Sequence, residues 1–186
     1  MKHPNGNIVI SHPHTPSGEE TWFDSSKIAT FTPLSNVSHL NSSRFIPSTI
    51  NHKIEIDFVS SPLLRTCAGI IMVEDERVWV VSPTNGFAST NTFPKGECQN
   101  EHLQTAAARE VYEETGFNAS IDSVLGDIVR RNSKTRYYLG RRLSGSPSDM
   151  AWESQALHLV PLSMLEDFVD REKDKEIARL LIKYVL

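Results

Sequence analysis

Apolar and polar residues alternate with different periods along the chain, and these periods predict where strands and helices lie. Residues 66–73 and 77–82 are apolar runs on either side of a short acidic stretch, which predicts two strands joined by a turn. Residues 120–129 and 136–143 predict two further strands. The strands are interrupted by a helical segment, so the pattern is that of an α/β domain.

The first predicted helix covers residues 100–115. Asn100 is a good N-cap, three consecutive alanines favour the helix, and Gly116 stands where a left-handed residue ends it. After residue 163 the apolar residues recur at helical spacing, and residues 173–185 predict an amphipathic helix. The apolar positions in these C-terminal segments are Leu165, Phe168, Val169, Ile177, Leu180, Leu181 and Tyr184.

Residues 1–60 differ in composition from the rest and predict a separate N-terminal extension before a domain of residues 61–186. The extension is rich in Ser, Thr, Asn and Pro, and has short β-like pieces at residues 8–10, 27–32 and 53–59. These pieces predict a β-rich extension that adds strands to the core sheet or to a partner subunit in a homodimer. A disordered arm is the competing interpretation.

Composition narrows the function classes. The chain has 186 residues, a formal net charge of −4 and two cysteines. The acidic balance argues against general nucleic-acid binding, which needs a basic surface. No apolar run approaches the roughly 20 residues that a membrane span requires. With at most one disulfide and no secretory signal pattern, we expect a cytoplasmic protein.

Three glutamates on the first predicted helix are the main chemical feature. Glu110, Glu113 and Glu114 stand at i, i+3 and i+4, so their carboxylates share one face, roughly 5–6 Å apart at Cβ. Like charges at this spacing repel, and an all-oxygen ligand set of this kind suits Mg²⁺ or Mn²⁺. A solvated acidic face is the simpler alternative.

The order of residues around these glutamates closely resembles the Nudix box, in which a glycine is followed by five residues, Glu, seven residues and REUxEExGU. The matching positions are Gly96, Glu101, Arg109, Glu110, Val111, Glu113, Glu114, Gly116 and Phe117. Only four residues separate Gly96 from Glu101, and His102 occupies the sixth position. We interpret this as a one-residue deletion with Glu101 keeping its role.

The resemblance implies a fold and a reaction. A Nudix-type α/β/α sandwich with a mixed β-sheet is expected, and the reaction is metal-assisted hydrolysis of a phosphoanhydride. The implied ligands of Mg²⁺ or Mn²⁺ are Gly96, Glu110, Glu113 and Glu114, with Arg109 orienting the carboxylates. Residues 152–162 resemble the late Nudix strand, which begins with a glutamate. Either Glu113 or this glutamate, Glu153, is the expected general base; a salt bridge at the rim is the alternative for Glu153.

The cations near the box suggest a substrate class. Lys95, directly before the box glycine, resembles the PKG signature of the dinucleoside polyphosphate and diphosphoinositol polyphosphate hydrolase branches. Arg65 is a second candidate for phosphate binding, and the basic turn at residues 130–134, with its Lys134, a third. Arg136 next to the turn and Tyr138, placed to stack on a base, complete the expected substrate-binding set. Solvated surface cations are the alternative.

Two other functions stay open at this point. ADP-ribose or a nucleotide sugar is the alternative substrate, favoured by N-terminal strands, which ADP-ribose pyrophosphatases often use to dimerise. A Nudix-fold module that binds a nucleotide without cleaving it is the alternative of another class. The complete set of Arg109, Glu110, Glu113 and Glu114 argues against it.

Overall fold

One mixed sheet organises the molecule. The computed structural model describes residues 8–11, 50–83, 90–151 and 153–185. Within them, seven strands form a sheet of order β1-β9-β3-β2-β7-β6, with β4 paired to β2. These strands are β1 (Ile8–Ser11), β2 (Arg65–Glu74), β3 (Arg77–Pro83), β4 (Lys95–Glu97), β6 (Ser123–Val129), β7 (Ser133–Gly140) and β9 (Ser154–Pro161). β2 and β7 are parallel and the other pairs antiparallel, as expected for a mixed sheet.

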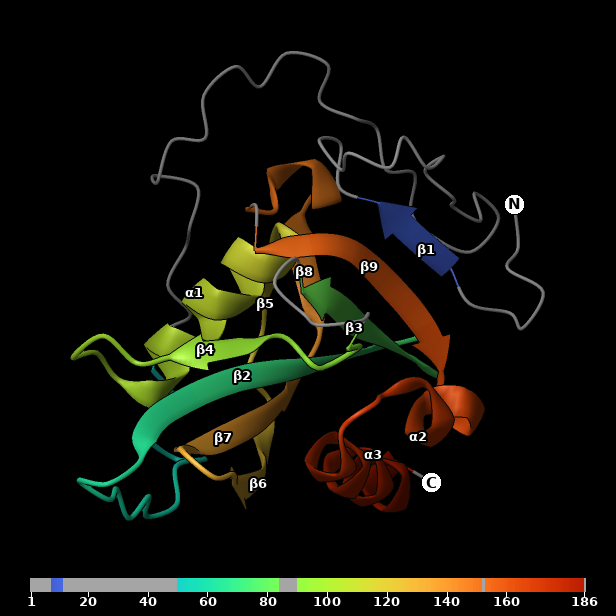
Figure 1. Cartoon of the computed structure of the whole chain (residues 1–186). Coiled ribbons are helices and arrows are strands. Elements are labelled where there is room, and N and C mark those ends of the chain that lie inside the picture. The colour runs from blue at the N-terminus through green and yellow to red at the C-terminus, as the bar shows by residue number, and fades with distance from the viewer. Residues whose placement is uncertain (1–7, 12–49, 84–89, 152, 186) are drawn as a thin grey trace.

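The central strands are buried on both faces, which explains their nearly continuous apolar runs. In β2, Ala68, Ile70 and Met72 face one core cluster, while Ile71 faces the other. Helix α1 (Leu103–Thr115) covers the first face, and α2 (Leu165–Phe168) and α3 (Glu172–Val185) cover the second (Figure 1). The predicted α/β/α sandwich is therefore confirmed.

Helix α1 begins later than the sequence predicts. Its N-cap is His102, whose Nδ1 accepts a hydrogen bond from the Gln104 N–H at 3.2 Å. Asn100 instead has a positive φ of 58°, a left-handed conformation that asparagine tolerates and that places it in the turn before the helix. Gly116 ends the helix with φ of 73°, as predicted.

The other predicted elements are shifted by a few residues. The strand expected at 136–143 is two strands, β7 and β8 (Arg142–Gly145), and β8 pairs with β5 (Phe117–Ala119) in a small second sheet. Short 3-10 turns precede β9 (η2, Pro147–Asp149) and follow it (η3, Leu162–Met164). On α3, Ile177 and Leu181 are buried, whereas Leu180 is 40% and Tyr184 60% exposed.

The N-terminal predictions have mixed outcomes. β1 forms where residues 8–10 predicted a strand, and it pairs antiparallel with β9 of the same chain (Figure 1). Residues 53–59 form no strand, because side chains of the domain rather than a neighbouring strand bind their main chain. Residues 27–32 lie outside the described residues. The division at residue 60 and the homodimer stay predictions.

No helix in the described ranges is long and apolar enough to cross a membrane. The two cysteines are free thiols. Burial raises the pKa of Cys67, and it raises that of Cys98 to about 12 with help from neighbouring negative charge. Both thiols are therefore protonated at neutral pH.

The end of α1 yields the first testable prediction. A Cβ at Gly116 would overlap the Ser146 carbonyl oxygen, and the φ is unfavourable for other residues. We expect Gly116→Ala to lower the free energy of unfolding by roughly 2–3 kcal/mol in urea titrations. Gly126→Ala is the matched control, because its Cβ meets only the flexible Leu180 Cδ2 at 3.0 Å. Equal losses in both variants would contradict this account.

Candidate active site

Helix α1 presents two buried carboxylates and one half-exposed carboxylate toward β4. Glu110 is 6% and Glu114 9% exposed, while the Glu113 side chain is 41% exposed. Gly96 lies in β4 directly against Glu110, where any Cβ would overlap the carboxylate. Glycine is therefore required at this position for Glu110 to approach the main chain of β4.

Arg109 links the carboxylates to one another. Its Nη1 donates to Glu110 Oε1 at 2.7 Å and to Glu113 Oε2 at 3.0 Å. Its Nε and Nη2 donate to Glu101 Oε1 at 3.0 and 2.6 Å, and Nη2 also donates to the Glu97 carbonyl oxygen. The shortened loop therefore still delivers Glu101 to this arginine.

Burial disfavours the ionised forms of the carboxyl groups in this cluster. Desolvation raises the pKa of Glu110 although Arg109 partly opposes it, and Glu113 and Glu153 add repulsion. Desolvation also raises the pKa of Glu114 to about 8, against the attraction of Lys95. A bound divalent cation would relieve the repulsion and favour the ionised carboxylates.

The donor set fits a hard divalent cation. Glu110 and Glu113 each give one oxygen to Arg109, and Glu114 Oε2 accepts from the Lys95 N–H at 2.8 Å. The second oxygen of each carboxylate is left for a ligand, and oxygen donors suit Mg²⁺ or Mn²⁺. Within the described ranges, no group of three or more His, Cys, Asp or Glu side chains is already placed to hold a metal ion.

Lys95 is held beside this cluster by neutral groups. Its Nζ donates to Thr92 Oγ1 at 3.2 Å and to the Phe93 carbonyl oxygen at 3.4 Å. Thr92 in turn donates to Asp174 Oδ2 on α3 at 2.8 Å. In the described part of the chain no carboxylate lies within ion-pair distance of Nζ, so its charge remains available to an anion. The sequence carries no local signal for the role of Thr92, because its partner Asp174 is 82 residues away.

Glu153 is close enough to the acidic cluster on α1 to act on it electrostatically. Its negative charge contributes to the raised pKa values of Glu110 and Glu114. The Ala151 N–H donates to the Glu113 carbonyl oxygen at 2.7 Å, which ties this segment to α1. Glu153 is exposed. The structure therefore brings the second candidate for the general base to the acidic cluster.

The remaining predicted substrate-binding residues are engaged elsewhere. Arg136 and Tyr138 are fully buried, and both donate to Glu55. Lys134 pairs with Asp127 at 3.6 Å, and Arg65 pairs with Glu97 at 3.4 Å in an exposed contact. In this structure Arg136 and Tyr138 cannot touch a substrate, because protein atoms cover them. The expectation for these two residues is corrected accordingly.

In the basic turn at residues 130–134, Arg130 has a structural role. Arg130 donates to Asp174, to Tyr137 and to Thr135, which fixes the turn to α3. Its pKa is raised, because these partners outweigh the cost of its burial. The charge of Arg130 is thus neutralised inside the protein and does not serve a polyphosphate.

Fold and site together define an α/β protein whose helix carries a cation-attracting acidic cluster. A model of the NUDIX domain matches residues 63–181. The chain therefore belongs to the NUDIX family, whose members are hydrolases that act on nucleoside diphosphate derivatives. No curated protein sequence matches the chain.

Solved structures show the same fold. A NUDIX hydrolase from Nitrosomonas europaea is similar with a TM-score of 0.57 at 14% identity, covering 65% of this chain and 90% of that one. An ADP-ribose pyrophosphatase from Streptococcus suis gives 0.54 at 16%, covering 64% and 90%. An Ap4A hydrolase from C. elegans gives 0.55 at 15%, covering 66% and 98%. At these identities the likeness concerns the fold alone.

The raised pKa of Glu114 predicts how stability depends on pH in the absence of metal. A raised folded-state pKa adds stability below the unfolded value of 4.5, and this stability is lost as the pH rises to about 8. With EDTA present, we expect the free energy of unfolding to fall over this range, by on the order of 5 kcal/mol from Glu114.

Urea titrations of the metal-free protein at several pH values measure this dependence. Glu114→Gln removes the titrating group and keeps its shape, so the variant is expected to show a clearly flatter curve. Parallel curves for the wild type and the variant would contradict the assignment.

Proposed function

We propose that the protein hydrolyses a phosphoanhydride bond of a long polyphosphate substrate in a reaction that requires Mg²⁺ or Mn²⁺. Diadenosine polyphosphates and diphosphoinositol polyphosphates are the favoured substrates. The observation that carries the proposal is the pair of buried carboxylates packed against β4, in which Arg109 holds Glu110 and the Lys95 N–H holds Glu114. Such a pair is unfavourable without a cation and suits one well.

Each residue of the cluster has a distinct role in this proposal. Glu110, Glu113 and Glu114 hold the metal together with the Gly96 carbonyl oxygen. The metal, when bound, neutralises phosphate oxygens and lowers the pKa of the attacking water. Glu113 or Glu153 accepts the proton of that water on a carboxylate oxygen. Arg109 keeps the carboxylates ionised and oriented through charge-assisted hydrogen bonds.

Lys95 is the proposed specificity residue. Its ammonium group is fixed by two neutral oxygen atoms close to the buried Glu114. A cation in this position favours binding of a substrate that carries further phosphate groups besides the two joined by the bond that is cleaved. Arg65 is exposed next to the box loop and can add to this effect once Glu97 releases it.

Hydrolysis of ADP-ribose or a nucleotide sugar is the second candidate. It is supported by β1, the N-terminal strand that extends the sheet at β9. A similar strand in a second copy would support the homodimer expected from the sequence. A NUDIX-fold module that binds without cleaving is disfavoured by the complete set of Arg109, Glu110, Glu113 and Glu114.

The role of the acidic cluster is tested by Glu114→Gln. We expect kcat to fall by about 100-fold or more with Mg²⁺, because one charge leaves the cluster without a change in shape. Product chromatography with diadenosine tetraphosphate measures the rate. Glu172→Gln, an exposed glutamate on α3, is the control and should keep wild-type turnover. Undiminished activity of Glu114→Gln would refute the assignment.

The role of Lys95 is tested with a substrate panel. Lys95→Met keeps the main-chain N–H that Glu114 needs and removes the ammonium group. We expect kcat/KM to fall about tenfold or more for diadenosine and diphosphoinositol polyphosphates, as for the loss of a charge-assisted hydrogen bond, and to change little for ADP-ribose. Lys173→Met on α3 is the control. A wild-type preference for ADP-ribose, unaltered in the variant, would favour the second candidate.

A further inference from the structure

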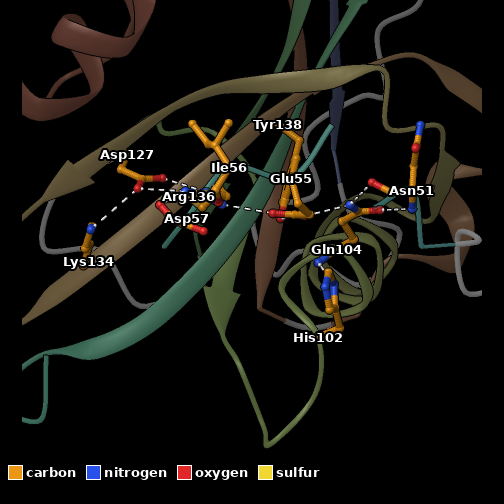
Figure 2. A network of polar contacts seen from close by, with 10 residues as sticks. All are labelled: Asn51, Glu55, Ile56, Asp57, His102, Gln104, Asp127, Lys134, Arg136 and Tyr138. Carbon is orange, nitrogen blue, oxygen red and sulfur yellow. Dashed lines mark hydrogen bonds and ion pairs between the residues drawn. The ribbon is translucent and has the colours of Figure 1, made fainter. Parts of the chain in front are cut away.

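Residues 51–57, here called the strap, lie outside the matched NUDIX region and cross from the start of α1 to β7. Figure 2 shows the strap bound to both elements by a continuous polar network. Most of its own side chains are exposed, including Ile56 at 61%. The strap is therefore held by hydrogen bonds and ion pairs rather than by an apolar core of its own.

At the helix, the strap is hydrogen-bonded to Gln104 in the first turn of α1. This side chain is fully buried. Its Oε1 accepts from the Asn51 N–H at 2.8 Å, and its Nε2 donates to the Asn51 carbonyl oxygen at 3.0 Å and to Glu55 Oε1 at 2.7 Å. The strap satisfies both donors and the acceptor of the amide, so its loss would leave a buried polar group unpaired.

At the sheet, Glu55 joins Gln104 to β7 (Figure 2). Its Oε1 also accepts from Tyr138 Oη at 2.6 Å, and its Oε2 accepts from Arg136 Nη1 at 3.0 Å. Burial alone would raise the pKa of Glu55, but the hydrogen bonds from Tyr138, Gln104 and Arg136 together lower it. Glu55 is thus an ionised bridge between the catalytic helix and the central sheet.

Arg136 secures the other half of the strap. Its guanidinium donates to the Ile56 and Asp57 carbonyl oxygens at 2.6 and 3.2 Å and pairs with Asp127 on β6. Since Arg136 is fully buried, these contacts place it as a fixed anchor. The main chain of the strap is thereby held next to Glu55, independently of the contacts that Glu55 makes with α1.

The strap and β4 hold α1 from two directions. On one side Gln104 is fixed by the strap, and on the other Glu114 accepts from the Lys95 N–H of β4. Glu114 follows Gln104 by ten residues, which at about 3.6 residues per turn places it roughly a quarter of a turn around the axis. Two anchors at different angles on one helix determine its rotation about its own axis.

We propose that Glu55 is a positioning residue for the acidic cluster, because it fixes the rotation of α1 on which the placement of Glu110 and Glu114 depends. The inference rests on the proposed metal-dependent function of that cluster. Glu55 touches neither the metal ligands nor the substrate and acts through Gln104. Loss of the bridge is expected to weaken metal binding more than it slows the metal-saturated reaction.

The test is Mn²⁺ binding by titration calorimetry on the full chain without substrate, together with the Mn²⁺ dependence of turnover. We expect Glu55→Ala to weaken Mn²⁺ binding about tenfold, the lower end for residues that orient metal ligands. The Mn²⁺ concentration for half-maximal turnover should rise by the same factor, with turnover at saturation within about threefold of wild type. Glu55→Gln, which keeps an acceptor for Gln104 and Tyr138, should restore most of the affinity.

Asp57→Ala is the matched control, because Asp57 lies in the same strap and contacts Arg136 through its carbonyl oxygen. It should bind Mn²⁺ as the wild type does. If Glu55→Ala lowers the unfolding temperature but leaves Mn²⁺ affinity unchanged, the strap is only structural and the inference is wrong. If Glu55→Ala does not fold, Mn²⁺ binding is measured on Tyr138→Phe, which removes one hydrogen-bond donor to Glu55. Unchanged Mn²⁺ affinity in that variant overturns the inference.

The outcome separates this inference from the proposed function. Binding of Mn²⁺ by the wild type that is lost in Glu114→Gln supports the metal site. If the metal site is supported in this way and the Glu55 variants bind Mn²⁺ with unchanged affinity, only the positioning role of Glu55 is overturned. Wild-type protein that binds no Mn²⁺, or binds it equally after Glu114→Gln, would overturn the proposed function itself.

Discussion

The close approach of Glu110 and Glu114 to β4 is the constraint on which the rest of the structure depends. Two carboxylates are removed from water next to a main-chain segment, which is unfavourable unless positive charge and hydrogen bonds offset it. Arg109 and the Lys95 N–H supply part of the compensation. The pKa values of Glu110 and Glu114 stay raised, so this compensation is incomplete, and the cation that we propose would supply the rest.

This constraint requires α1 to lie close to the sheet at a defined rotation. The face of α1 toward the core consists largely of alanines, Ala106 and Ala107 among them, and these small side chains permit a close approach. Small side chains specify the rotation of a helix poorly, because they interlock little with their neighbours. Hydrogen bonds add the directional constraint that this apolar packing lacks, and the Gln104 side chain makes three of them to the strap.

The cations of the molecule divide by the partners they have. Arg109, Arg130 and Arg136 each pair with carboxylates inside the protein, so their charges are neutralised by the fold. Lys95 donates to a hydroxyl and a carbonyl oxygen and keeps its charge for an incoming anion. The sequence does not show that Arg130 and Arg136 belong to the paired group, because their carboxylate partners Asp174 and Glu55 are 44 and 81 residues away.

The sequence by itself determined the local features of this protein. Helical spacing places Glu110, Glu113 and Glu114 on one face, and the left-handed Gly116 ends α1 where expected, since both depend only on near neighbours. The α/β/α arrangement was implied by the resemblance of the residues around these glutamates to the Nudix box. Tertiary structure alone decided that Arg136 and Tyr138 are buried under the strap, since Glu55 is 81 and 83 residues away from them. Such contacts depend on chain folding over long separations, for which local propensity carries no signal.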